Sequence, residues 1–144
     1  PYVPGLLSFR EAPAVLVALR KLRTEPDVLI LDGQGRAHPR RFGLACHVGI
    51  LVDRPAIGCA KSRLCGQHID PPPLRGSRTV LQMDGETIGL VLRTQDRVKP
   101  VYVSVGHRIT LAQAAEIVLT CCTRYRLPEP TRQAHIAVTR LRKG

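Results

Sequence analysis

Two short apolar segments, each followed directly by a charged residue, constrain the fold of this chain most. Val28 to Leu31 is followed by Asp32, and Ala56 to Ala60 is followed by Lys61. Both segments have the length and apolar character of buried strands. Apolar residues at helical spacing over 13–22, behind a proline suited to a first helical turn, predict a helix before the first strand. Helices and buried strands are therefore expected to alternate.

The remaining sequence continues this alternation. It predicts a helix weakened by two glycines over 42–51, a surface loop over 67–78, a hairpin of strands 79–83 and 87–93 around Asp84-Gly85-Glu86, a strand over 101–105, a helix from a capping box at Thr110 to about Arg124, and a last helix from about Thr131. With 144 residues, 44% of them hydrophobic, one domain spanning 1–144 is expected. The predicted fold class is α/β, with a mixed sheet, helices on its faces and one antiparallel hairpin.

The charge balance favours a polyanionic partner. Lysine and arginine number 22 against 11 acidic residues, which gives a formal net charge of +11. A field of that sign attracts nucleic acid and raises its encounter rate. Other anionic surfaces, or solubility through self-repulsion, are the alternatives. With few aromatic residues and no tryptophan, an array of stacked bases is not expected.

Segments for targeting and for disulfide bonding are not evident. The chain has no run of about 18 apolar residues and no signal-peptide pattern at its start, so a soluble, cytoplasmic protein without a membrane partner is expected. Its five cysteines are an odd number without a CxxC pair. Buried or reduced thiols are the favoured interpretation, and a metal role for Cys59 and Cys65 is the alternative.

Asp32, Lys61 and Glu11 are the residues best placed for chemistry. If the two buried strands are parallel neighbours, Asp32 and Lys61 meet at the sheet edge where α/β proteins bind ligands. A plain salt bridge is the alternative. Glu11 precedes the predicted first helix and would stabilise its N-terminus, but near Asp32 it would provide a second carboxylate for a hard cation such as Mg²⁺. Two carboxylates and a lysine suit metal-assisted phosphodiester hydrolysis.

Two histidines stand at further candidate positions. His38 lies in the segment 32–41, where two glycines and three arginines would allow close approach to a phosphate, although the Gly-x-Gly pattern fails the dinucleotide fingerprint. His107 follows a predicted strand, where a structural, hydrogen-bonding role is the favoured alternative. The basic C-terminal third is equally compatible with a solvated face.

Several strings together resemble the endonuclease V, or deoxyinosine 3′-endonuclease, family. They are Pro1 to Glu11, Leu31 to Gly35 with His38-Pro39-Arg40, Ile57 to Lys61, Gly106-His107-Arg108, and Tyr125 to Arg132. Their order and approximate spacing also match the family, and they extend from the first residue nearly to the last. The resemblance implies a ribonuclease H-like fold and cleavage of the second phosphodiester bond 3′ to inosine in DNA, RNA or both.

The resemblance also implies roles for particular residues. Glu11 and Asp32 would bind Mg²⁺ or Mn²⁺, and Lys61 would act on the attacking water or the scissile phosphate. His38 and His107 would support the site. The residues implied for strand separation are Tyr2 and Pro4, and those implied for the pocket of the flipped base are Leu7, Gly35, Gly43 and Gly58. A backbone-lined pocket suits hypoxanthine, which has lost the exocyclic amine of adenine.

The resemblance has one departure. No counterpart precedes Pro1 for the strand on which the family carries another metal-binding aspartate. We therefore expect a partial, N-terminally truncated endonuclease V-like domain with an exposed strand edge and apolar helix faces. The first hypothesis is a monomeric, inosine-directed endonuclease that acts in nucleic-acid repair or processing. The second is a catalytically inactive relative that binds nucleic acid, and the third is a basic structural protein. Metal dependence separates the first two.

Overall fold

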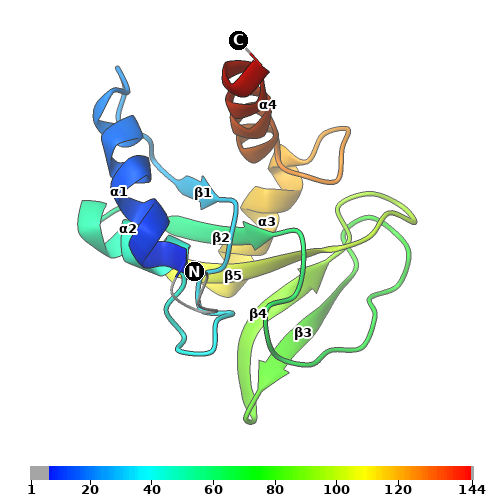
Figure 1. Cartoon of the computed structure of the whole chain (residues 1–144). Coiled ribbons are helices and arrows are strands. Elements are labelled where there is room, and N and C mark those ends of the chain that lie inside the picture. The colour runs from blue at the N-terminus through cyan, green and yellow to red at the C-terminus, as the bar shows by residue number, and fades with distance from the viewer. Residues whose placement is uncertain (1–6, 144) are drawn as a thin grey trace.

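The structure is a computed structural model that describes residues 7–143, with side chains for residues 10–141. It contains one sheet with helices packed against it (Figure 1). The elements in chain order are α1 (Leu7–Arg20), β1 (Leu29–Leu31), α2 (Leu44–Val52), β2 (Ala56–Ala60), β3 (Arg78–Met83), β4 (Glu86–Leu92), β5 (Val101–His107), α3 (Leu111–Cys121) and α4 (Glu129–Lys143). The predicted α/β class is confirmed.

The sheet is mixed, as the sequence predicted. Its five strands follow the order β1-β2-β5-β4-β3. β1 and β2 are parallel, with Leu31 opposite Gly58, whereas β5 is antiparallel to both β2 and β4. The β3–β4 hairpin closes through Asp84 and Gly85, which both have positive φ values of 54° and 74°. Positive φ at both positions is the geometry of a tight hairpin turn that favours Asp-Gly.

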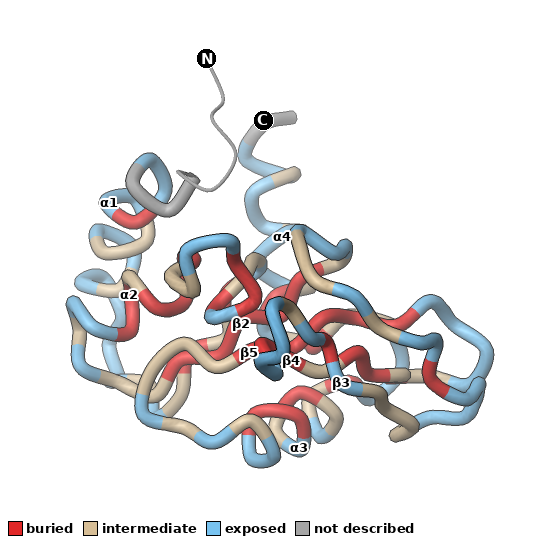
Figure 2. Tube along the Cα trace, turned by 90° about the horizontal axis from the view of Figure 1, so that it is seen from below, coloured by how far each residue is buried: buried red, intermediate tan, exposed pale blue. Residues whose placement is uncertain are grey.

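Alternate residues of β2 point to opposite faces of the sheet, and each face is covered differently. Ile57 and Cys59 are buried in the cluster that includes Val118 of α3. Ala56 packs on the other face with residues of α1, β1 and α2. Figure 2 shows the buried stretches of β2 and β5 between α2 and α3. The core therefore has one layer on each face of the sheet.

Local signals located the elements well, except for the first helix. The capping box at Thr110 is present, with hydrogen bonds of 3.1 Å and 3.0 Å exchanged with Gln113. The prediction that Pro13 occupies the first turn of α1 was wrong, because the helix already includes Leu7 and Pro13 lies inside it. Glu11 consequently does not stand at the start of this helix.

The expected exposed apolar residues on helices are present, whereas Leu29 and Leu31 of the edge strand β1 are buried. β1 and β3 form the two edges of the sheet within residues 7–143. Val17 of α1 and Ile50 and Leu51 of α2 are each more than half exposed. All five cysteines are free, and Cys46, Cys59 and Cys122 are buried. No described helix is long and apolar enough to cross a membrane.

Candidate active site

The ion pair between Asp32 and Lys61 is the centre of the candidate site. Each residue directly follows one of the two parallel strands, so both lie at the edge formed by the carboxyl ends of β1 and β2. The Lys61 Nζ lies 3.3 Å from the Asp32 Oδ2, and the two side chains are 40% and 49% exposed. The predicted meeting is confirmed, and both charges remain accessible to a ligand.

The loop after Asp32 lies directly on the sheet because glycines leave room for it. A Cβ atom at Gly58 would stand 2.3 Å from the Gly35 nitrogen, and one at Gly43 would stand 2.4 Å from the Gln34 oxygen. The Gly35 amide donates a 2.8 Å hydrogen bond to the buried Oγ of Ser104. The structure thus brings together the three glycines predicted to line a base pocket, but the atoms packed against them belong to the protein backbone.

Two side chains hold the Lys61 segment in place. Gln34 donates through Nε2 to the Ser62 carbonyl at 3.1 Å. The guanidinium of Arg126 donates to the Lys61 carbonyl and also to the carbonyls of Lys99 and Pro100, the latter two at 2.8 Å. This role of Arg126 was not predictable from sequence, because an arginine after a helix is usually solvated.

The chain neighbours of Glu11 and Asp32 belong to one buried cluster, and no described contact joins the two carboxylates themselves. Ala12 is fully buried and belongs to the same cluster as Leu31, while Glu11 itself is exposed. Two carboxylates fit Mg²⁺ in kind, because this ion commonly uses one or two carboxylates together with water and substrate phosphates. Among the side chains of residues 10–141, however, no three His, Cys, Asp or Glu residues form a group that could hold a metal ion.

The basic loop over 32–41 is held by the β3–β4 turn. Arg36 and Arg41 form ion pairs of 2.9 Å and 3.1 Å with Glu86. His38 is buried, and its Nδ1 accepts a 3.0 Å hydrogen bond from the Arg40 amide. Arg36 and Arg41 are therefore partly neutralised, and the His38 ring is enclosed by protein.

The family model described as Endonuclease V matches residues 1–136 of this chain. The chain belongs to the endonuclease V family. The endonuclease V of Roseiflexus sp. (strain RS-1) is 61% identical over 134 residues, which are 93% of this chain and 60% of that protein. The chain thus spans about 60% of the length of the curated endonuclease V relatives it matches.

Solved endonuclease V structures have the same fold. The crystal structure of the Streptomyces avermitilis endonuclease V superposes with a TM-score of 0.95 at 49% identity, covering 99% of this chain and 63% of that one. The Ciona intestinalis endonuclease V, solved with a DNA that contains an inosine, has a TM-score of 0.80 at 30% identity, covering 99% of this chain and 68% of that one. The fold that the resemblance implied is confirmed.

In this endonuclease V chain, His107 lies far from the Asp32–Lys61 pair. It pairs with Ala56 in the sheet, at the beginning of β2, whereas Lys61 follows the end of that strand. A strand of this length separates the two positions by roughly 15 Å. The His107 Nε2 lies 3.0 Å from Asp53 Oδ1. This hydrogen bond lowers the pKa of Asp53, and the nearby charge of Arg108 lowers it further. The structure does not place His107 with the other predicted site residues.

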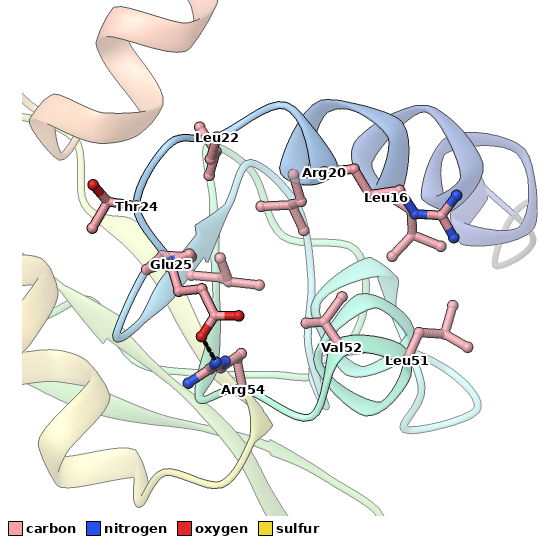
Figure 3. Close-up of a pocket in the computed structure, with 11 residues that line it drawn as sticks. Leu16, Arg20, Leu22, Thr24, Glu25, Leu51, Val52 and Arg54 are labelled. Atoms are coloured by element: carbon pink, nitrogen blue, oxygen red, sulfur yellow. Dashed lines mark hydrogen bonds and ion pairs between the residues drawn. The ribbon is translucent and has the colours of Figure 1, made fainter.

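The predicted wedge residues of the family, Tyr2 and Pro4, lie outside the described residues, as does the side chain of Leu7. A separate hollow with a volume of about 460 Å³ lies between the ends of α1 and α2 (Figure 3). It is lined by Leu29 at the start of β1, and an ion pair between Glu25 and Arg54 lies beside it. The hollow is therefore at the opposite end of β1 from Asp32.

Proposed function

We propose that this chain provides the Asp32–Lys61 part of an inosine-directed, metal-dependent endonuclease, which hydrolyses the second phosphodiester bond 3′ to the deaminated base in DNA or RNA. The observation that carries the proposal is the accessible Asp32–Lys61 pair at the strand edge of a chain that belongs to the endonuclease V family. The net charge of +11 supports a polyanionic substrate. The inosine-containing DNA bound by the Ciona intestinalis relative supports the choice of lesion.

Each residue has a distinct role in this proposal. The Lys61 ammonium stabilises the negative charge that develops on the scissile phosphate during hydrolysis. Asp32 holds Lys61 toward the strand edge before substrate binds. Asp32 and Glu11 would hold Mg²⁺ or Mn²⁺, which supplies activation of the attacking water and neutralisation of phosphate charge. The backbone contact from Arg126 fixes the position from which Lys61 extends.

The test compares matched oligonucleotides with and without one inosine, in DNA and RNA form, with Mg²⁺ or EDTA. Asp32→Asn keeps the size of the side chain and removes its charge, so we expect cleavage to fall by at least about 100-fold while binding changes little. Asp53→Asn is the matched control, because Asp53 is an exposed, ion-paired aspartate at the opposite edge of the sheet. Equal cleavage by the two variants would reject the assignment of Asp32.

A non-catalytic nucleic-acid binder is the second candidate function. It is supported by the net charge of +11, which attracts nucleic acid without requiring a bound metal. This candidate predicts binding that is equal in Mg²⁺ and EDTA and no cleavage of any of the oligonucleotides. Metal-dependent cleavage next to inosine rejects it.

A further inference from the structure

Tyr125 has the features of a stacking platform. The residue is 46% exposed, and it is one of only three tyrosines in the chain. The guanidinium carbon of Arg132 lies 3.9 Å from the centre of the Tyr125 ring. Arg132 also forms a 3.3 Å ion pair with Glu129. A cation packed on an aromatic ring and anchored by a carboxylate restrains the orientation of that ring.

The loop that carries Tyr125 is attached directly to the candidate active site. The Tyr125 carbonyl accepts a 3.1 Å hydrogen bond from Gln95 Nε2. The next residue is Arg126, whose guanidinium bridges the carbonyls of Lys61 and Lys99. Backbone segments that are distant in sequence therefore meet around Arg126, and Tyr125 lies one residue away from the group that binds the Lys61 carbonyl.

Positive charge surrounds this junction. Lys99 and Arg124 are exposed, and neither takes part in an ion pair with the residues that the structure describes. No carboxylate among the described side chains therefore holds either cation in an ion pair. An exposed aromatic ring among uncompensated cations is the combination by which proteins bind single-stranded nucleic acid, because bases stack on the ring and phosphates contact the cations.

We propose that Tyr125 stacks against an unpaired base of a nucleic-acid strand leading away from the Asp32–Lys61 pair, while Lys99 and Arg124 contact the adjacent phosphates. The inference rests on the proposed function to the extent that this chain binds nucleic acid, but it requires no cleavage. It assigns a contact that does not depend on inosine. A single platform is also compatible with the low aromatic content, which argues only against an extended array of stacked bases.

The first test measures binding of a short oligothymidylate without inosine, in EDTA. Base stacking contributes about 1–3 kcal/mol per base, so Tyr125→Leu should weaken binding between about 5-fold and about 150-fold. Tyr125→Phe keeps the aromatic ring and should bind within about 2-fold of the wild type. An abasic oligonucleotide of equal length should bind the wild type and Tyr125→Leu equally, because it offers phosphates without bases.

The second test addresses the phosphate contacts. Lys99→Gln and Arg124→Gln should each reduce the slope of log K against log salt by about 0.7, the value for one contact with a single strand. Lys21→Gln is the control, because Lys21 is exposed just after α1, beside the hollow at the other end of β1. We expect the slope of this variant to equal that of the wild type.

The outcomes separate this inference from the proposed function. If wild-type chain binds oligothymidylate and Tyr125→Leu binds it equally well, the stacking inference is overturned while inosine-directed cleavage stands on its own assay. Loss of binding in Tyr125→Leu and Tyr125→Phe alike, with unchanged circular dichroism spectra, also overturns it. Selective loss in Tyr125→Leu supports it, whether or not the chain cleaves inosine-containing substrates.

Discussion

Replacing Gly35 with alanine should destabilise the protein strongly, because no space exists for the added carbon. A Cβ atom at Gly35 would stand 2.2 Å from the Val105 oxygen and 2.7 Å from the Val105 carbon. Distances below 3.0 Å essentially never occur for a real Cβ atom. Both neighbouring atoms belong to the backbone of β5, so the loop must move away from the sheet.

The movement would break buried hydrogen bonds as well as packing. The Gly35 amide donates to Ser104 at 2.8 Å, and the Arg36 amide donates to Val105 at 2.9 Å. Overpacking of a close-packed region costs about 1–3 kcal/mol, and one unsatisfied buried amide costs about 1–3 kcal/mol more. We expect the free energy of unfolding to fall by roughly 3 kcal/mol, measured by urea denaturation and far-ultraviolet circular dichroism, since the chain lacks tryptophan.

Gly33 in the same loop offers a matched control. A Cβ atom at Gly33 would meet its nearest neighbour, the Leu44 side chain, at an ordinary distance of 3.7 Å. Gly33→Ala should therefore remain within about 1 kcal/mol of the wild type, because the site accepts a methyl group without displacement. The reasoning fails if Gly35→Ala and Gly33→Ala unfold at the same urea concentration.

Two further predictions concern local contacts. Thr110→Ala should lower the free energy of unfolding by about 1 kcal/mol in urea denaturation, because the capping box then leaves the Gln113 amide without its partner; full stability in this variant would contradict that role. Hydrogen bonds from Arg36 and then Arg41 hold the pKa of Glu86 below its ordinary value of 4.5, so their stabilisation is complete above that pH and is lost as the pH falls through the lowered folded-state pKa. The stability difference between wild type and Glu86→Gln should therefore shrink below pH 4.5, and a difference independent of pH would exclude this coupling.

The Asp32–Lys61 pair was predictable because two local patterns were sufficient to locate it. Each apolar segment identified a buried strand, and the polar residue that follows each strand could then be placed at its carboxyl end. The pairing required one further assumption, that the strands are parallel neighbours, which the structure confirms. A helix between two apolar strands indicates that the strands are parallel, because parallel strands need a crossover connection, here α2.

The place of His107 was not predictable from the same kind of pattern. His107 also ends a strand, but β5 is antiparallel to β2. The carboxyl end of β5 therefore lies beside the start of β2, away from the carboxyl ends of β1 and β2. Apolar alternation identifies a strand without fixing its direction. The start of α1 was missed for a related reason. Pro13 favours a first turn on local grounds, whereas the burial of Ala12 in one cluster with Leu31 and Leu44 arises only in the folded chain.

The sequence also could not show which arginines bind backbone carbonyls and which remain free to bind a ligand. Arg93 and Arg126 each donate to three backbone carbonyls in the long connections of the chain. Arg75 donates to two such carbonyls, those of Thr94 and Cys122, and to the Leu119 carbonyl in the last turn of α3. These connections lack strand or helix partners for their carbonyls, and a planar guanidinium with five donors satisfies several at once, which a lysine ammonium does less well. Part of the net charge of +11 is therefore committed to holding loops together. Fewer cations are therefore free to contact phosphate than the composition indicates. The exposed Lys99 and Arg124 should accordingly contribute a larger share of the affinity for nucleic acid.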